Sequence, residues 1–101
     1  MNHRFTDAGR ADFHEAIARY AAAADLGKKF AEEVREYVTI IEANPQGFSR
    51  APGCPRGREI RVVKIGRFDY LLYHEVLPTE VVIIAITHAS RNDRGWGKRT
   101  P

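Results

Sequence analysis

A histidine followed closely by an arginine marks the end of the most apolar segment of the sequence. His88 comes shortly after the run Val81–Ile86, and Arg91 lies three residues further on. An imidazole can take or give a proton near neutral pH, and a guanidinium can bind a phosphate through two hydrogen bonds. Arg61 and Lys64, from an earlier segment, could add positive charge. Cleavage of RNA through its 2′-hydroxyl needs such groups, so His88, Arg91 and Arg61 are candidate catalytic residues.

Two of these residues also have a purely structural interpretation. His88 could cap its strand by bonding a neighbouring backbone group, since the sequence identifies no carboxylate partner for it. Arg61 could form a cross-strand ion pair with Glu75 or with another acidic residue. The sequence leaves both interpretations open.

The C-terminal segment is basic and contains the single tryptophan. Arg94, Lys98 and Arg99 follow Arg91, and Trp96 stands between two glycines. Its indole could stack on a base, anchor a protein interface or close the core beneath the sheet. The cations suit an acidic protein segment or a nucleic-acid complex, although short basic tails are commonly just solvated. These five residues, Arg91, Arg94, Trp96, Lys98 and Arg99, are the candidate target-binding residues.

The composition is that of one small globular domain spanning residues 1–101. The hydrophobic share is 44%, the charged share is 29% and the formal net charge is +3, which favours an acidic partner. Cys54 has no second cysteine to pair with, and the histidines are scattered, so no disulfide, metal or cofactor site is predicted. The longest apolar run is too short to span a bilayer, and no signal peptide is evident, so we expect a cytoplasmic protein without a membrane partner.

The first half of the chain predicts a short strand and two amphipathic helices. The strand covers residues 3–6, and Asp7 is the expected N-cap of a helix that ends near Asp25. Gly27 is expected to close that helix, because glycine adopts the left-handed conformation without steric cost. A second helix then carries an apolar stripe until Asn44 and Pro45 stop it; the stripe is Leu26, Phe30, Val34, Val38 and Ile41.

The second half predicts a loop and three antiparallel strands. Residues 45–57 are rich in glycine and proline, whereas residues 59–65, 68–76 and 80–87 are rich in β-branched and aromatic residues and are separated by short turns. Both faces of the middle strand are partly apolar, so we expect one face to receive the helices and the other to stay open for a partner. The predicted fold class is α+β, with an N-terminal short strand and a helical hairpin packed on a small, mainly antiparallel sheet.

The order of four sequence pieces resembles the RelE/ParE superfamily of bacterial toxins. The pieces are RFTDAGRADFHEAIARY, the helix exit at Asn44, GREIRVVKIGRFDYLLYHEV and IAITHASRNDRGW. The likeness covers nearly the whole chain, and it lies in the order of the pieces rather than in any single motif. Plasmid-stabilisation members often have a proline after the aspartate that corresponds to Asp93, and this chain lacks it.

The resemblance implies a growth-inhibiting toxin with one of two mechanisms. RelE-like members are similar to metal-independent ribonucleases that cut messenger RNA on the ribosome, whereas ParE-like members inhibit DNA gyrase. RelE-like nucleases have an arginine where this chain has Tyr70, and a tyrosine cannot supply fixed positive charge to a transition state. That difference favours the ParE, or plasmid-stabilisation, branch and gyrase as the target. A ribosome-dependent nuclease is the alternative, and a degenerate member that retains only antitoxin binding is a third.

The resemblance also implies a protein partner. Toxins of this superfamily are neutralised by a cognate antitoxin in a hetero-oligomer, and we expect an apolar helix or strand of the antitoxin to cover the sheet and the helical groove. The second partner would be the target, either DNA gyrase or the ribosome with its messenger RNA.

Overall fold

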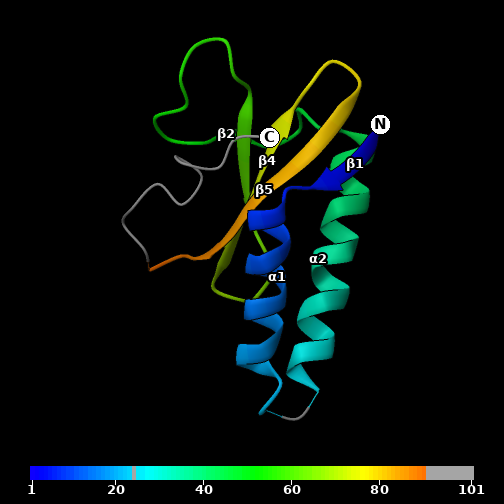
Figure 1. Ribbon diagram of the computed structural model, residues 1–101, viewed down its shortest axis with the longest axis vertical. Coiled ribbons are helices and arrows are strands. Elements are labelled where there is room, and N and C mark those ends of the chain that lie inside the picture. Colours follow the sequence, from blue (N-terminus) through cyan, green and yellow to red (C-terminus); the bar gives the residue numbers. More distant parts are fainter. Residues whose placement is uncertain (24, 91–101) are drawn as a thin grey trace.

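Two helices and five strands form the described part of the chain, with the helical pair packed against the sheet (Figure 1). The structure, a computed structural model, describes residues 1–23 and 25–90. The elements in chain order are β1 (Asn2–Phe5), α1 (Asp7–Tyr20), α2 (Leu26–Ala43), β2 (Ser49–Arg50), β3 (Ile60–Lys64), β4 (Tyr70–Val76) and β5 (Glu80–His88). The α+β fold class expected from the sequence is confirmed.

The sheet is mainly antiparallel and has the strand order β1-β5-β4-β3-β2. The three strands predicted in the second half pair as expected, β3 with β4 and β4 with β5. β1 joins one edge by parallel pairing with β5, so that Asn2 lies opposite Glu80. β2 joins the other edge as a two-residue strand inside the segment that was predicted to be a loop.

The first helix begins and ends earlier than the sequence predicts. Thr6, rather than Asp7, is the N-cap: its Oγ1 accepts the Gly9 N–H at 2.9 Å. Asp7 is instead the first helical residue, where its negative charge faces the positive end of the helix dipole. The helix ends at Tyr20 rather than near Asp25, and the Ala23 N–H bonds to the Tyr20 carbonyl in the turn that follows.

Gly27 was expected to close α1, but it lies in the first turn of α2. It is buried where the two helices approach each other, and a Cβ there would lie 3.2 Å from the Ile17 carbonyl oxygen. The glycine therefore allows close helix packing rather than a left-handed turn. The end of α2 at Ala43, with Asn44 as the C-cap, agrees with the prediction.

The main core lies between the helices and one face of the sheet. The predicted stripe of α2 is confirmed, since Phe30, Val34, Val38 and Ile41 are all buried there. The aromatic rings of α1 and β4 join this core, with Tyr20 and Phe30 each within about 6 Å of Tyr70. The buried members are Ala16, Phe30, Val34, Val38, Ile41, Ile65, Phe68, Tyr70, Leu72, Val81, Ile83 and Ile86.

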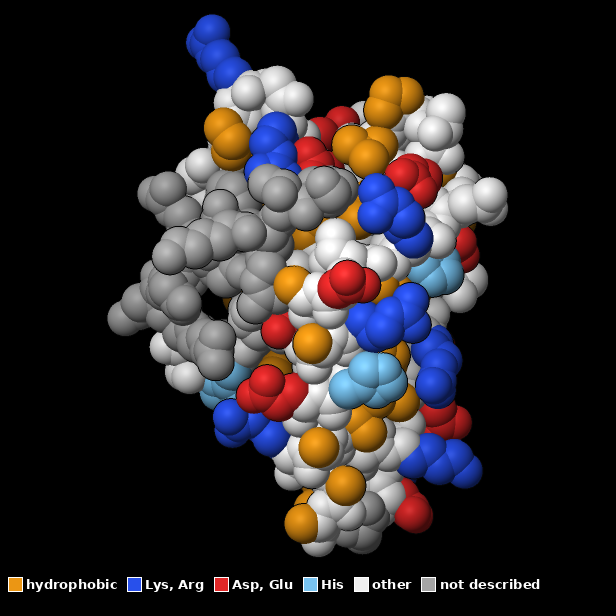
Figure 2. All heavy atoms as spheres, viewed as in Figure 1, with side chains coloured by type: hydrophobic (Ala, Val, Ile, Leu, Met, Phe, Trp, Pro, Cys, Tyr) orange, Lys and Arg blue, Asp and Glu red, His pale blue; other side chains and the backbone are white. Residues whose placement is uncertain are grey.

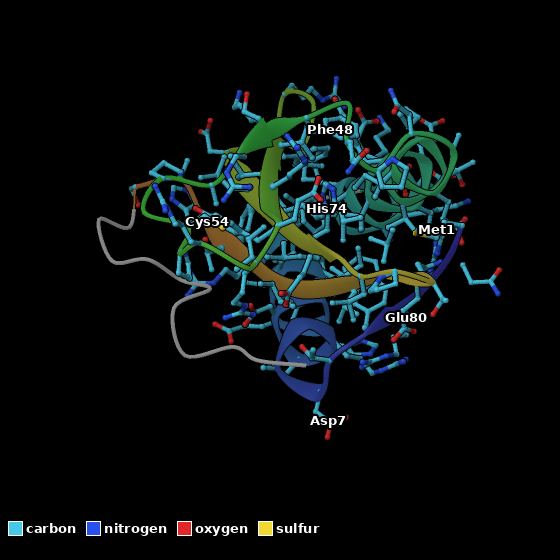
Figure 3. All side chains as sticks on the ribbon, turned by 90° about the horizontal axis from the view of Figure 1, so that it is seen from above. Met1, Asp7, Phe48, Cys54, His74 and Glu80 are labelled. Atoms are coloured by element: carbon cyan, nitrogen blue, oxygen red, sulfur yellow. The ribbon has the colours of Figure 1, made fainter. Side chains whose placement is uncertain are left out.

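The second face of the sheet is not open, contrary to the sequence-based expectation. A smaller cluster covers it, formed by Ala51, Ile60, Tyr73, Val82, Ile84 and Ala85 with Cys54 packed against them. The segment around Cys54 lies on the side of the sheet opposite α2 (Figure 3). Arg58 anchors this segment through two hydrogen bonds to the buried Glu75, at 2.7 and 2.9 Å. The 51–58 segment therefore takes the place that a partner was expected to take.

An irregularity in β5 positions the end of that strand. The register of β4 and β5 shifts between Tyr73 and His74, so that Ile84 is an extra residue. Parallel pairing with β1 ends at Ile83, whose carbonyl accepts the Thr6 N–H at 3.1 Å. Beyond this point α1 replaces β1 beside β5, and the Asp12 carboxylate accepts the Ile86 N–H at 3.0 Å.

Neither α1 nor α2 is long and apolar enough to cross a membrane, and these are the helices within residues 1–23 and 25–90.

Candidate functional site

His88 lies at the exposed end of β5, opposite Tyr70 of β4. The two rings meet edge to face with centroids 5.3 Å apart. The backbone N–H of Ser90 donates to Nδ1 of His88 at 3.1 Å, and the Ser90 hydroxyl lies 2.7 Å from the same nitrogen. Because Nδ1 accepts a hydrogen bond, the neutral ring carries its proton on Nε2. The capping interpretation of His88 is thus confirmed, although the ring stays accessible.

A polar cavity of about 410 Å³ opens beside His88. It lies between α1 and the end of β5, and one stripe of α1 supplies its carboxylates and its guanidinium. Asp12, Glu15 and Arg19 follow each other at three- and four-residue spacing, which places them on one face of a helix. The full lining is Asp12, Glu15, Ala16, Arg19, Tyr70, Ile86, Thr87, His88 and Ser90.

The α1 side of this cavity is negatively charged overall. It presents two carboxylates against one guanidinium, and the Glu15–Arg19 contact of 3.7 Å is loose and largely exposed to water. Such a wall attracts a basic or hydrogen-bonding group and repels a phosphate. Tyr70 adds no charge, and burial raises the pKa of the adjacent Tyr20, with smaller contributions from Tyr70 and Asp69. The Tyr20 phenol therefore remains neutral at physiological pH.

Arg61 is not brought to His88. It lies on β3 opposite His74, whereas His88 lies opposite Tyr70, so the two are separated by four residues along β4, roughly 13 Å, as well as by the strand between them. The Arg61 guanidinium bonds to Glu59 at 2.9 Å and to the Phe48 carbonyl at 2.6 Å. Its ionic partner is thus Glu59, two residues earlier in the same segment, so the expected cross-strand pair with Glu75 is wrong; Glu75 pairs with Arg58 instead.

Lys64 is more accessible than Arg61 but points to a different neighbour. Its ammonium group lies 3.8 Å from the Asp69 carboxylate, and both side chains are more than half exposed. Arg91 and the other candidate target-binding residues, Arg94, Trp96, Lys98 and Arg99, lie outside the described residues. In residues 1–23 and 25–90, no three His, Cys, Asp or Glu side chains come together as a metal site.

Sequence reasoning missed the contribution of α1 to this site. Asp12, Glu15 and Arg19 have the spacing of a polar helix face, which the sequence alone presents as ordinary solvated surface. A signal was available in that spacing, but it did not show that the end of β5 would lie beside this face. Only the arrangement of α1 against β5 brings the carboxylates to His88.

Comparisons with known proteins bear on the fold and the family of the chain. A family model described as the ParE toxin of type II toxin–antitoxin systems, parDE, matches residues 4–93. A solved chain of the chromosomal ParDE toxin–antitoxin system from P. aeruginosa has the same fold, with a TM-score of 0.75 and 19% identity over 89% of this chain and 97% of that one. No curated protein matches the sequence. Since the family model spans most of its length, the chain belongs to the ParE toxin family of type II toxin–antitoxin systems.

Proposed function

We propose that this toxin arrests growth by binding and inhibiting DNA gyrase in the cytoplasm, using the surface around His88 and the segment that follows it. The observation that carries the proposal is the set of groups around His88. Asp12 and Glu15 line the cavity beside the imidazole, while Arg61 is held elsewhere by Glu59. This combination suits contact with basic and polar side chains of a protein better than contact with RNA.

The requirements of RNA cleavage also argue against a nuclease site at His88. Cleavage of RNA develops negative charge on the phosphate, and stabilising it requires fixed cations within hydrogen-bond distance of that charge. Among the described residues, the only guanidinium that lines the cavity is Arg19, which is more than half exposed and lies closest to Glu15. Tyr70 occupies the position where RelE-like nucleases have an arginine, so one expected source of charge is missing.

Inducing the toxin without antitoxin tests the target. We expect plasmids in the arrested cells to lose negative supercoiling, and purified toxin to inhibit supercoiling by purified gyrase. Messenger RNA ends should stay unchanged. Cleavage at ribosomal A-site codons with normal supercoiling would replace the proposal with the nuclease alternative. Normal growth on induction would favour a degenerate member.

Two variants test the surface. Arg91→Ala and His88→Ala should each weaken gyrase inhibition about tenfold or more, because the proposed contact depends on both groups. Arg56→Ala provides the matched control, since Arg56 is an exposed arginine in the 51–58 segment on the other side of the sheet. Equal inhibition by all three variants would show that gyrase contacts a different surface.

A further inference from the structure

The edge of β5 loses its strand partner before the strand itself ends. β1 pairs with β5 as far as Ile83, whereas β5 continues to His88. Figure 1 shows β5 running on beyond β1 and behind α1. Over these last residues the element beside the strand is α1, and a helix uses its backbone groups for its own hydrogen bonds. The backbone ladder of the sheet therefore stops at this edge while β5 goes on.

The pairing of β4 with β5 determines which backbone groups face that edge. The Ala89 N–H donates to the Asp69 carbonyl at 2.8 Å, so residue 89 directs its backbone groups to β4. In an antiparallel pair, successive residues direct these groups alternately to the two edges. Ile86 and His88 consequently direct their N–H and C=O groups away from β4, towards α1. The bond from the Ile86 N–H to Asp12 of α1 agrees with this direction.

Most of these edge groups are not used within the toxin. In residues 1–23 and 25–90 the structure gives no hydrogen-bond partner to the Ile86 carbonyl or to the N–H and C=O of His88. Both residues line the cavity at His88, so their free groups lie at its wall. One residue of a strand parallel to β5 could donate to the Ile86 carbonyl and accept from the His88 N–H at the same time.

The opposite wall of the cavity favours a positively charged occupant. Asp12 and Glu15 of α1 supply two carboxylates there, and the Glu15 side chain is 65% exposed. In Figure 2, acidic, basic and histidine side chains lie close together beside α1, in the lower left of the view. A segment with a lysine or arginine would complement this wall, whereas an acidic segment would be repelled by it.

From the open strand edge and the acidic wall we infer that the toxin binds its target by strand addition at the end of β5. An extended segment of gyrase that carries a lysine or arginine would continue the ladder from the point where β1 leaves it. Its backbone would bond to Ile86 and His88, and its basic side chain would lie against Glu15. The inference rests on the proposed function, because it specifies how the surface around His88 recognises gyrase.

Charge reversal on the α1 wall tests the side-chain part of the inference. In calorimetry with purified gyrase, we expect Glu15→Lys to weaken binding about tenfold and Glu15→Gln to weaken it less, because the first variant adds a repelling charge. Glu36→Lys makes the same charge change at an exposed position of α2 and should leave the affinity unchanged. Thermal melts establish that each variant is folded. Unchanged affinity of Glu15→Lys would overturn the inference.

Hydrogen exchange tests the backbone part. The His88 amide should exchange rapidly in the free toxin, and gyrase should slow it about tenfold or more. The Ile86 amide is the internal reference, since it is already bonded to Asp12 in the free toxin. Slow exchange of the His88 amide without gyrase would show that the edge is already paired and would overturn the inference. Protection by gyrase at other amides, with His88 unchanged, would overturn it as well.

The same measurements separate this inference from the proposed target. If wild-type toxin binds gyrase but Glu15→Lys and the His88 amide show no effect, strand addition is wrong and gyrase remains the target. If wild-type toxin does not bind gyrase at all, both proposals are wrong.

Discussion

At the scale of single residues, His74 is a fully buried titratable side chain in the sheet. Its Nε2 lies 2.9 Å from the Pro45 carbonyl oxygen and therefore donates to it, while Nδ1 has no hydrogen-bond partner in the described structure. The ring also meets Phe48 edge to face. Burial is the largest influence and lowers the pKa of His74; the hydrogen bond to the Pro45 carbonyl opposes it, the Arg61 charge lowers the pKa further, and the Glu59 charge has the smallest effect, which raises it. The imidazole is therefore neutral in the folded protein.

This burial predicts a loss of stability in mild acid. The unfolded chain takes up a proton at His74 below its ordinary pKa of about 6.5, whereas the folded protein does not, so the stabilisation is complete above that pH and falls below it. Between pH 7.5 and 5.5 the free energy of unfolding should drop by up to about 1.4 kcal/mol from this group. Urea titrations of wild type and His74→Gln measure it, since the amide keeps a donor but does not titrate. Parallel pH dependence in both proteins would contradict the prediction.

At the residue scale, the sequence predicted the role of a side chain correctly where its partners are close by in the chain. The position of His88 at a strand end followed from the apolar run before it, and its contact with Ser90 is local. The roles of Thr6 and Arg61 were missed because each depends on a choice between equivalent neighbours. Thr6 and Asp7 are both good capping residues, and Arg61 had more than one acid within reach.

At the scale of elements, α1 and β5 approach each other through Gly9. A Cβ on this residue would lie 2.5 Å from the carbonyl oxygen of Ile83, closer than side-chain carbons come to backbone oxygens. That carbonyl belongs to the β5 residue at which pairing with β1 ends, so neither partner can shift freely. Gly9 thus fixes the distance on which the cavity at His88 depends.

Gly9→Ala should therefore destabilise the protein even though alanine favours helices. We expect a loss of about 1–3 kcal/mol in the free energy of unfolding from the clash, against a gain of about 1 kcal/mol from helix propensity in an unhindered helix. Gly27→Ala, where the nearest atom would be 3.2 Å away, should cost less. Denaturant titrations compare the two. A stabilising Gly9→Ala would show that α1 can move away from β5 without penalty.

The 51–58 segment is held on the sheet by the ion pair of Arg58 and Glu75. The Glu75 side chain is 6% exposed and that of Arg58 24%, and the pair raises the pKa of Arg58. Glu75→Gln leaves the guanidinium without its partner and should lower the free energy of unfolding by about 2 kcal/mol or more. Glu80→Gln breaks the half-exposed pair with Arg4 and should cost below about 1 kcal/mol. Equal losses would contradict the assigned role of Glu75.

Local pairing explains which elements the sequence could predict. The three late strands were predicted because turns at Gly66 and Pro78 join neighbours in the chain, and the stripe of α2 follows from a single helical period. The coverage of the second face was missed, since an irregular segment such as 51–58 has no periodic signal. The pairing of β1 with β5 could not be predicted either, because the paired residues lie far apart in the sequence.

At the scale of the whole molecule, α1 separates two surfaces. Glu15 and Arg19 face the cavity at His88, whereas Phe13 lines an apolar hollow between β1, α1 and α2, and His14 stacks against that phenylalanine. The surface proposed to bind the target and the apolar hollow beside β1 are therefore different regions joined by one helix. The sequence predicted the first from His88 and the basic segment, but the second required the assembled sheet edge.

The parallel pair of β1 and β5 predicts how the sheet forms. Asn2 pairs with Glu80, 78 residues further along the chain. Because long loops must close before such a pair forms, folding should be slow for a chain of this size, in the range of milliseconds to seconds. Pulse-labelling hydrogen exchange during refolding should show the Thr6 amide becoming protected together with those of β5. Early protection of Thr6 alone would contradict this order.

That pairing also limits when the protein can become harmful to the cell that makes it. Within the described residues β1 pairs with β5 alone, so β1 stays unpaired until β5 has been synthesised. The position of α1 depends on its contacts with both strands. An incomplete chain on the ribosome consequently lacks the helix–strand contact that forms the cavity at His88. The surface proposed to bind the target therefore forms only after β5 has been synthesised, and an antitoxin already present in the cell has that period in which to reach the chain.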